Sequence, residues 1–289
     1  MDFTRTLSQF EKNLEQKGRS RFTITAYIKD LEQLISFLRK NKINEWSEAN
    51  SKILEKYFLQ LRQETELTPK SISRKINSTK TLYKFLISVK EIDEDYSKDI
   101  KHPVIQRQVP RVLSPLEYKA LRDTAKSNVR LYTMIEMLLQ TGMRIGELSR
   151  LERKDINEKV TQMKIEAYSS YPERTISINS SLKNALEKYM KSEPYRSKKS
   201  KYVFFTRSGN KILIRNIRST INAAFKSTGI KDATVNDLRN TFIIFQLENG
   251  LKIDILAEIV GHKRQTTTEH YLEFIQTRTH KTTSRIIPL

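Results

Sequence analysis

The sequence has 289 residues, and its 53 lysines and arginines exceed its 33 aspartates and glutamates, giving a formal net charge of +20. A chain of this length suits two domains and can bury a sizeable core. The basic excess indicates a polyanionic partner, because Lys and Arg that neutralise phosphates release condensed counterions. The charge alone would also suit a protein that associates with a membrane surface or with a ribosome. The absence of cysteine excludes disulfides, thiol catalysis and cysteine-based zinc sites.

Targeting and metal-binding signals are missing from the pattern. The first residues carry acids and no apolar core of a signal peptide, and no apolar run approaches the roughly 18 residues of a spanning helix. We therefore expect a soluble, cytoplasmic protein with no membrane partner. No metal site is expected either, because the histidines lack carboxylate partners at suitable spacing; they are His102, His262, His270 and His280.

The first part of the chain, from about Phe3 to Val89, has the apolar spacing of helices. Two helices are expected to join near Gly18, and a third contains Ile53 to Leu61. A fourth starts where Thr68 precedes Pro69, since Thr caps a helix and Pro suits its first position. One face of this fourth helix is rich in lysine and arginine, and such a face is ordinarily just solvated.

The helical period lapses between Ile92 and Leu113, so residues 93–112 are the predicted linker. Acidic residues come first, and Pro103 and Pro110 then restrict the backbone. The basic side chains of this segment, Lys101, Arg107 and Arg111, are candidates to follow DNA phosphates.

A second helical region begins at Ser114, where Ser at the N-cap, Pro at the first helical position and Glu117 at the third predict a helix start. A buried helix covers Leu131 to Leu139 and ends at Gly142. Arg144 then opens another helix, beside backbone N–H groups that favour an anion; it can also pair with Glu147. The alternation in residues 162–178 predicts a β-hairpin, residues 203–205 a short extended run, and residues 214–225 a helix.

The stretch from Thr234 to Phe274 predicts two amphipathic helices separated by Asn249 and Gly250, with a Thr-rich turn before Tyr271. Together, Arg239, His262 and Tyr271 could grip and attack a phosphate, because a phenol can act as a covalent nucleophile and Arg supplies fixed donors. Taken singly, Arg239 could be a surface residue, His262 a helix-end cap and Tyr271 a core residue.

Four motifs in the right order resemble those of the tyrosine recombinase (phage integrase) family, most of all its Xer-type and transposon-resolvase members. The family box TGxRxxEL is met by Thr141, Gly142, Arg144, Glu147 and Leu148. The box HxLRHTF is met by Leu238, Arg239, Thr241 and Phe242. Gly261 and His262 meet the LGH box, and Tyr271 follows at the family's usual distance.

Two departures from the family pattern matter. Asn236 replaces the first histidine of the second box, and an amide hydrogen-bonds but does not shuttle a proton at neutral pH. The family lysine lies in the hairpin turn, where residues 166–175 of this chain contain none. Lys164, just before that turn, is the nearest candidate for its role.

The resemblance implies a mainly α fold with a small β-hairpin sheet, in which two domains form a C-shaped DNA clamp. Residues 1–92 would be the helical core-binding (SAM-like) domain, and residues 113–289 the catalytic domain with its C-terminal tail. The family's TxxxYxxDLxxFxxFL signature is also present, as Thr23, Tyr27, Asp30, Leu31, Leu34, Phe37 and Leu38. The DNA contacts favoured on this basis are Ser71, Arg74, Lys75, Lys80, Arg107 and Arg111.

The implied activity is site-specific DNA recombination through a 3′-phosphotyrosyl intermediate and a Holliday junction, for integration, excision or resolution. The implied catalytic set is Arg144, Asn236, Arg239, His262, Tyr271 and Lys164. Neither ATP nor a metal cofactor is implied. The expected partners are a double-stranded DNA recombination site and three further protomers, with a second recombinase as an alternative. The departures leave two other hypotheses: a DNA-binding protein with weakened catalysis, and a type IB topoisomerase.

Overall fold

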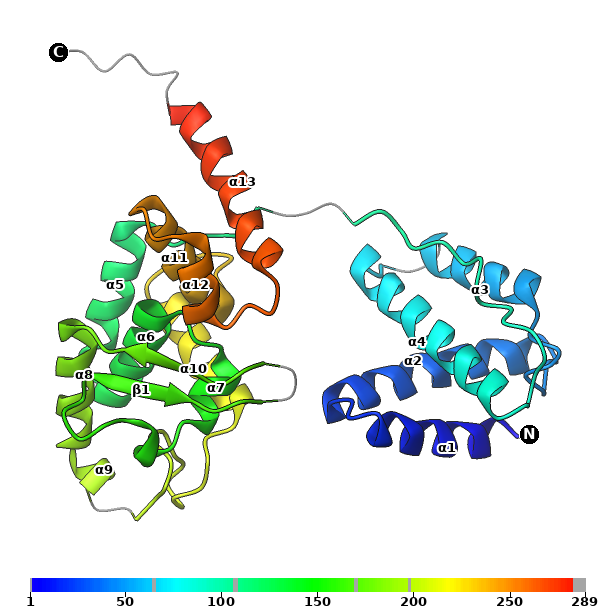
Figure 1. The fold of residues 1–289 in the computed structure, drawn as a ribbon, viewed down its shortest axis with the longest axis horizontal. Coiled ribbons are helices and arrows are strands. Elements are labelled where there is room, and N and C mark those ends of the chain that lie inside the picture. Colours follow the sequence, from blue (N-terminus) through cyan, green and yellow to red (C-terminus); the bar gives the residue numbers. More distant parts are fainter. Residues whose placement is uncertain (1, 64–65, 106–108, 169–170, 197–198, 283–289) are drawn as a thin grey trace. The chain divides into compact units, whose positions relative to one another are not determined.

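The computed structural model describes residues 2–63, 66–105, 109–168, 171–196 and 199–282 (Figure 1). The chain divides into two compact units, Met1–Arg107 and Gln108–Leu289, which we name the N-terminal unit and the C-terminal unit. The structure is mostly helical with one two-stranded antiparallel sheet, so the predicted fold class is confirmed.

The helices of the N-terminal unit are α1 (Phe3–Gln16), α2 (Arg21–Lys40), α3 (Ser51–Gln63) and α4 (Pro69–Ser88). The predicted start of α4 is confirmed, because the Thr68 hydroxyl accepts a hydrogen bond from the Ser71 N–H and Pro69 takes the first helical position. Trp46 lies fully buried in the core of this unit, with its ring 4.6 Å from that of Phe3.

The C-terminal unit contains the β-hairpin and the remaining helices. The predicted capping box at Ser114 and Glu117 is confirmed at the start of α5. The hairpin strands are β1 (Gln162–Ile165) and β2 (Arg174–Ser177), paired with Met163 opposite Ile176. The helices are α5 (Pro115–Ala125), α6 (Val129–Thr141), α7 (Ile145–Arg150), α8 (Ser180–Met190), α9 (Glu193–Arg196), α10 (Ile214–Ser227), α11 (Val235–Glu248), α12 (Ile253–Val260) and α13 (Gln265–Thr282), with a 3-10 turn at Arg153–Asp155.

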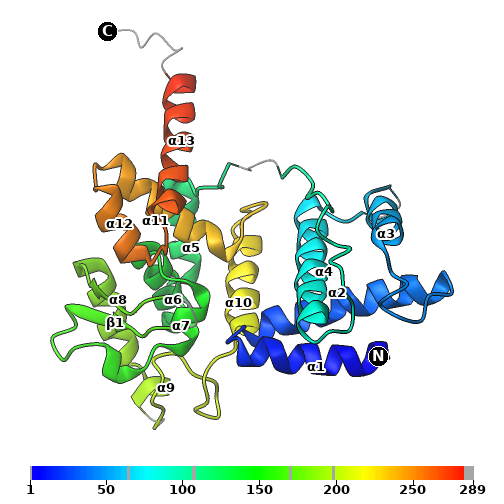
Figure 2. The ribbon, with the colours of Figure 1, turned by 45° about the vertical axis from the view of Figure 1, so that its right-hand side comes forward.

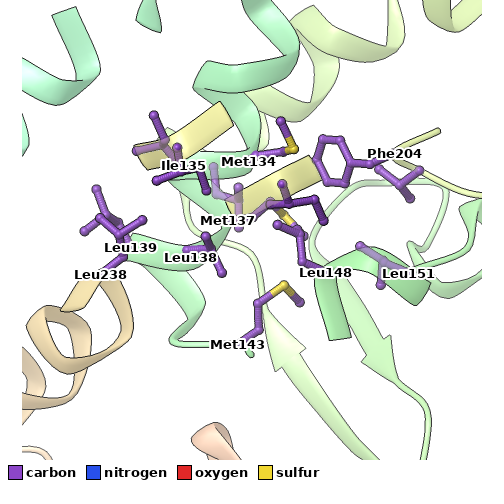
Figure 3. Close-up of a cluster of buried hydrophobic side chains, with 14 of the residues drawn as sticks. Met134, Ile135, Met137, Leu138, Leu139, Met143, Leu148, Leu151, Phe204 and Leu238 are labelled. Carbon is purple, nitrogen blue, oxygen red and sulfur yellow. The ribbon is translucent and has the colours of Figure 1, made fainter. Parts of the chain in front are cut away.

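Helix α6 forms the centre of the core of this unit and packs against α5, α8 and α11. Its buried side chains Met134 and Leu138 lie among residues of α7 and of the loop that carries Phe204 (Figure 3). Helices α11, α12 and α13 contact one another and are grouped at one end of the unit (Figures 1 and 2). The core therefore holds the end of α6 and the start of α7 against this three-helix group.

Residues 203–205, predicted as a short extended run, contribute an isolated bridge between Phe205 and Lys211 and belong to no strand of the described sheet. One local prediction was wrong. The Thr-rich segment before Tyr271 is not a turn but the first turn of α13. Thr268 is fully buried there, so tertiary packing overrides the weak helix propensity of threonine.

Candidate functional site

Arg144 lies where α6 ends and α7 begins. Gly142 ends α6 in the left-handed conformation, and Arg144 is the extended residue that precedes α7, as predicted. The Arg144 backbone N–H donates to the Glu147 carboxylate at 2.8 Å, and its Nη1 donates to the same group at 3.2 Å. The Arg144 guanidinium also lies 4.0 Å from the centroid of the Tyr171 ring. Two side-chain contacts and one backbone contact therefore fix the direction of Arg144.

Arg239 reaches the same place from α11 and is buried, with 9% of its surface exposed. Its Nη1 donates to the Gly142 carbonyl and its Nη2 to the Val260 carbonyl at 2.9 Å. Burial, and secondarily the Arg144 charge, lower the pKa of Arg239 to about 9, which leaves the guanidinium protonated at neutral pH.

The last carbonyls of α12 hold the arginines of the site together. Arg144 donates to Val260 at 3.1 Å and to Gly261 at 2.9 Å, while Arg239 shares the Val260 oxygen. A third arginine, Arg174 of β2, donates through Nε to Ile259 at 2.7 Å. The negative end of a helix dipole favours cations in this position. We name Ile259–Gly261 the α12 carbonyl cluster.

Glu147 and Arg174 form a buried, bidentate ion pair beneath this cluster. Arg174 Nη1 and Nη2 donate to the two Glu147 carboxylate oxygens at 3.0 and 2.7 Å, and both side chains are 5% exposed or less. Burial alone raises the pKa of Glu147, but the hydrogen bonds and charges of Arg174 and Arg144 lower it on balance. The carboxylate therefore stays charged and anchors two of the three arginines.

His262 follows Gly261, the left-handed cap of α12, and its Nδ1 lies 2.8 Å from the Thr268 hydroxyl. Burial, together with the charges of Arg239 and Arg144, lowers the pKa of His262 to about 3. The imidazole is therefore neutral at physiological pH. Thr268 fixes its Nδ1, so Nε2 is the nitrogen left for a substrate.

Tyr271 lies on α13 with its ring stacked on His262, at a centroid distance of 6.2 Å and an interplanar angle of 16°. Its hydroxyl donates to the Asn240 side-chain oxygen at 3.0 Å, and its ring packs against an apolar cluster that includes Phe242. Burial raises the pKa of Tyr271, although the Arg239 and Arg144 charges oppose this shift. A phenol, a neutral imidazole and two guanidinium groups thus meet at one end of the unit.

Comparison with known proteins identifies the family of the chain. The phage integrase family matches residues 111–277, and its N-terminal SAM-like domain matches residues 7–90. The chain belongs to the phage integrase family. Its class is that of the tyrosine site-specific recombinases. No helix in the described part of this integrase has the length and apolar character needed to span a membrane.

Curated relatives of the integrase cover almost its whole length. A protein named tyrosine recombinase from Pseudothermotoga lettingae is 29% identical over 274 residues, which is 94% of each chain. The tyrosine recombinase XerD of Rickettsia bellii is 28% identical over 284 residues and 92% of each chain. Among solved structures, a lambda integrase dimer bound to a core site has a TM-score of 0.76 at 16% identity, covering 94% of this chain and 95% of that one. The XerA recombinase has a TM-score of 0.55 at 24% identity, covering 99% and 100%.

Two predicted catalytic residues of the integrase lie apart from these contacts. Asn236 is exposed in the first turn of α11, and no hydrogen bond of its side chain is found within the described residues. Lys164 is on the exposed face of β1, where its ammonium pairs with Glu173 at 3.0 Å and its side chain is half exposed. The arginine, histidine and tyrosine candidates converge, whereas Lys164 pairs outward.

The predicted DNA contacts of the N-terminal unit have different surroundings. Ser71 is partly exposed near the start of α4, and the exposed Arg74 pairs with Asp30. Lys75 is buried, with 3% of its surface exposed, and its ammonium donates to Asp30 at 2.9 Å. Its burial contradicts the expectation of a DNA contact, since α4 turns this residue toward α2. Lys80 is partly exposed and donates to the Lys98 carbonyl at 3.0 Å.

Of the linker candidates, Arg107 lies outside the described residues. Arg111 pairs with Glu117 at 2.7 Å and donates to the Lys231 carbonyl at 3.0 Å. Its contacts therefore all lie within the C-terminal unit.

Three residues of the site were missed by sequence reasoning. Asn240 directly follows Arg239, so its proximity to the site was open to inference, but its bond to Tyr271 depends on how α13 packs on α11. Arg174 begins the second hairpin strand and resembles an ordinary surface arginine until Glu147 is placed beside it. Thr268 carried no distinguishing signal.

Proposed function

We propose that this chain cleaves and rejoins double-stranded DNA by forming a covalent bond between Tyr271 and a 3′ phosphate. The observation that carries the proposal is the position of the Tyr271 hydroxyl. This hydroxyl donates to Asn240, one residue after Arg239, and the Tyr271 ring stacks on His262. An oriented phenol beside fixed cationic donors is the arrangement that nucleophilic attack on a phosphodiester needs.

Arg144 and Arg239 would hold the non-bridging oxygens of the scissile phosphate. A guanidinium has five N–H donors. The contacts described use three of them for Arg144 and two for Arg239, so both retain donors for a phosphate. Because the carbonyls already orient both groups, little reorganisation is needed when negative charge develops at phosphorus.

His262 and Asn236 would add further hydrogen bonds to the phosphate. If the Thr268 hydroxyl donates to Nδ1 of the neutral imidazole, the ring proton is on Nε2 and can be donated to an oxygen. Asn236 offers an amide where the family pattern has histidine. It would act as a donor near the positive end of α11 rather than as an acid.

In the proposed reaction, the Tyr271 oxygen forms a bond to phosphorus and loses its proton, while the 5′ oxygen departs and gains one. The ester energy is kept in the phosphotyrosine, so a 5′ hydroxyl of a partner strand can reverse the step without ATP or metal chemistry. Two rounds of this exchange pass through a Holliday junction, and the solved structures include a lambda integrase tetramer bound to one. We propose the same assembly here, serving integration, excision or resolution.

DNA binding would depend on the net charge of +20 and on exposed basic groups of both units. Arg74 and Lys80 are the proposed contacts on α4, with the hydroxyl of Ser71 near its start. Arg111 is the proposed contact at the start of the C-terminal unit. Each of the three basic side chains contacts a neighbouring carbonyl or carboxylate, which would hold it in place for a phosphate oxygen.

The test is covalent trapping on nicked DNA fragments from the source genome and its mobile elements. Wild type should give SDS-resistant protein–DNA adducts, and Tyr271→Phe should give none while shifting the same fragments in a gel. Arg144→Ala should reduce the adduct rate by about 10²–10³, the usual effect of losing one fixed donor. Asn236→His, which restores the residue of the family pattern, should form the adduct at the wild-type rate or faster.

The alternatives give different results in the same assay. Band shifts without any adduct would favour the DNA-binding hypothesis and refute the proposal. Relaxation of supercoiled DNA that requires no second site would favour a topoisomerase. An adduct that persists in Tyr271→Phe would show that another residue is the nucleophile.

A further inference from the structure

The departing 5′ oxygen needs a proton, and the described lysines beside the hairpin are occupied elsewhere. Lys164 pairs with Glu173 at 3.0 Å on the exposed face of β1. Lys154 pairs with Glu166 at 3.2 Å and with Glu152 at 3.4 Å. Lys164 on β1 and Lys154 in the 3-10 turn are thus both paired with carboxylates, and neither contacts the arginines of the site within the described residues.

The other nearby polar groups are poor acids. Asn236 carries an amide, which does not give up a proton at neutral pH. The neutral imidazole of His262 can donate a hydrogen bond, but it cannot release a proton to an alkoxide as an imidazolium can. The site so far described therefore contains a nucleophile and charge stabilisers without a general acid.

Lys263 brings an ammonium near the same aromatic ring that Arg144 contacts. It follows His262 directly, and its Nζ lies 5.9 Å from the centroid of the Tyr171 ring. The Arg144 guanidinium lies 4.0 Å from the centroid of the same ring. The hairpin turn thus places one aromatic ring in contact with both the phosphate-binding Arg144 and the Lys263 side chain.

The surroundings of Lys263 leave its ammonium available. The residue is exposed, in the connection between α12 and α13, and no carboxylate pairs with it within the described ranges. The Tyr171 face attracts the cation without neutralising it. An exposed arm anchored beside His262 can turn toward a bound phosphodiester, because its backbone is fixed by the left-handed Gly261 cap and the His262 N–H bond to Ala257 at 2.8 Å.

From this juxtaposition we infer that Lys263 is the general acid of the strand-cleavage step, in place of the lysine that the hairpin turn lacks. The inference rests on the proposed phosphotyrosyl chemistry. The Tyr271 hydroxyl loses its proton to solvent and its oxygen bonds to phosphorus. As the 5′ O–P bond breaks, the Lys263 ammonium gives its proton to the 5′ oxygen and becomes an amine. In rejoining, the attacking 5′ hydroxyl returns that proton to the Lys263 amine.

The test compares two nicked duplexes that carry the site recovered from the covalent adducts. One has the natural 5′ bridging oxygen at the scissile phosphate and the other has sulfur there. A thiolate departs without a proton, because thiols are far stronger acids than alcohols. Lys263→Ala should slow adduct formation about 10²–10⁴-fold on the oxygen substrate, the usual contribution of a general acid, and much less on the sulfur substrate.

Two further variants separate proton transfer from charge and from local structure. Lys263→Arg keeps the charge but holds its proton, so it should behave like Lys263→Ala on both substrates. Arg264→Ala removes the neighbouring exposed cation and should match wild type on both. Tyr171→Leu, which removes the ring beside Lys263, should show a smaller loss that sulfur also reverses.

Several results would overturn the inference. They are a wild-type rate for Lys263→Ala or Lys263→Arg on the oxygen substrate, equal slowing of Lys263→Ala on both substrates, and sulfur rescue of Lys164→Ala instead. Each of these results is read only where wild type forms the adduct and Tyr271→Phe does not. It therefore refutes the role of Lys263 and leaves the proposed function standing. Failure of wild type to form any adduct would refute the proposed function, and the inference with it.

Discussion

Replacing Glu147 by Gln tests whether the buried ion pair holds the arginines of the site. The Glu147 carboxylate accepts bonds from Arg174 at 3.0 and 2.7 Å and from Arg144 at 3.2 Å. An amide of the same shape removes the charge and one acceptor, which leaves the Arg174 guanidinium buried without an anion. Removing one partner of a buried pair costs about 3–5 kcal/mol of the free energy of unfolding.

The chain offers a convenient way to measure this loss. Trp46, the single tryptophan, is buried in the N-terminal unit, so its fluorescence reports the unfolding of that unit. Circular dichroism also follows the helices of the C-terminal unit. With a urea dependence of about 2–3 kcal/mol/M, Glu147→Gln should lower the midpoint seen by circular dichroism by about 1–2 M. The Trp46 transition should stay where it is.

The matched control is Glu173→Gln in the same hairpin. Its partner is Lys164, and both side chains are about half exposed, so the change should cost no more than about 1 kcal/mol. The difference in free energy of unfolding between wild type and Glu147→Gln should also become smaller as the pH is lowered. The pKa of Glu147 is lowered from 4.5 in the folded protein, so its stabilisation is complete above that value and disappears as the pH falls through the folded pKa. Equal effects of the two substitutions would refute the assigned role of the pair.

Three other predictions concern the same site. Gly142→Ala should destabilise the C-terminal unit by about 1–3 kcal/mol in urea unfolding, because a Cβ would lie 2.4 Å from the Phe242 ring and φ is +60°. Asn240→Ala should slow adduct formation by less than about tenfold and leave the DNA band shift intact, because it removes one hydrogen bond from Tyr271. The urea midpoint of unfolding should decrease as the pH is lowered from 7 to 5, and His262→Gln should make this decrease smaller. The reason is that the pKa of His262 is lowered in the folded protein, so the unfolded chain takes up a proton that the folded chain does not.

Local chemistry made much of the fold predictable. The starts of α4 and α5 follow from side chains that satisfy the first N–H groups of each helix, within a few residues of the sequence. Gly142 ends α6 because a left-handed cap suits glycine. These signals involve neighbours along the chain, so no knowledge of the tertiary structure was needed.

Predictions that depended on tertiary packing were less successful. Lys75 belongs to the same basic helix as Arg74, and the pattern does not tell which cation faces water. In the folded unit α2 presents Asp30 to both, and Lys75 becomes the buried partner. The outward pairing of Lys164 likewise depends on Glu173, the residue just before the opposite strand.

The motifs pointed to the candidate site residues but not to what holds them. A cluster of three arginines would repel itself, and a single carboxylate, Glu147, offsets only part of that charge. The rest of the support comes from backbone carbonyls at the end of α12, which no side-chain motif records. Because carbonyl dipoles orient the guanidinium groups without neutralising them, the site keeps a net positive charge and a fixed geometry before DNA arrives. The free-energy cost of ordering the arginine side chains is therefore met when the chain folds and not in the transition state, which is what the proposed attack on a phosphate requires.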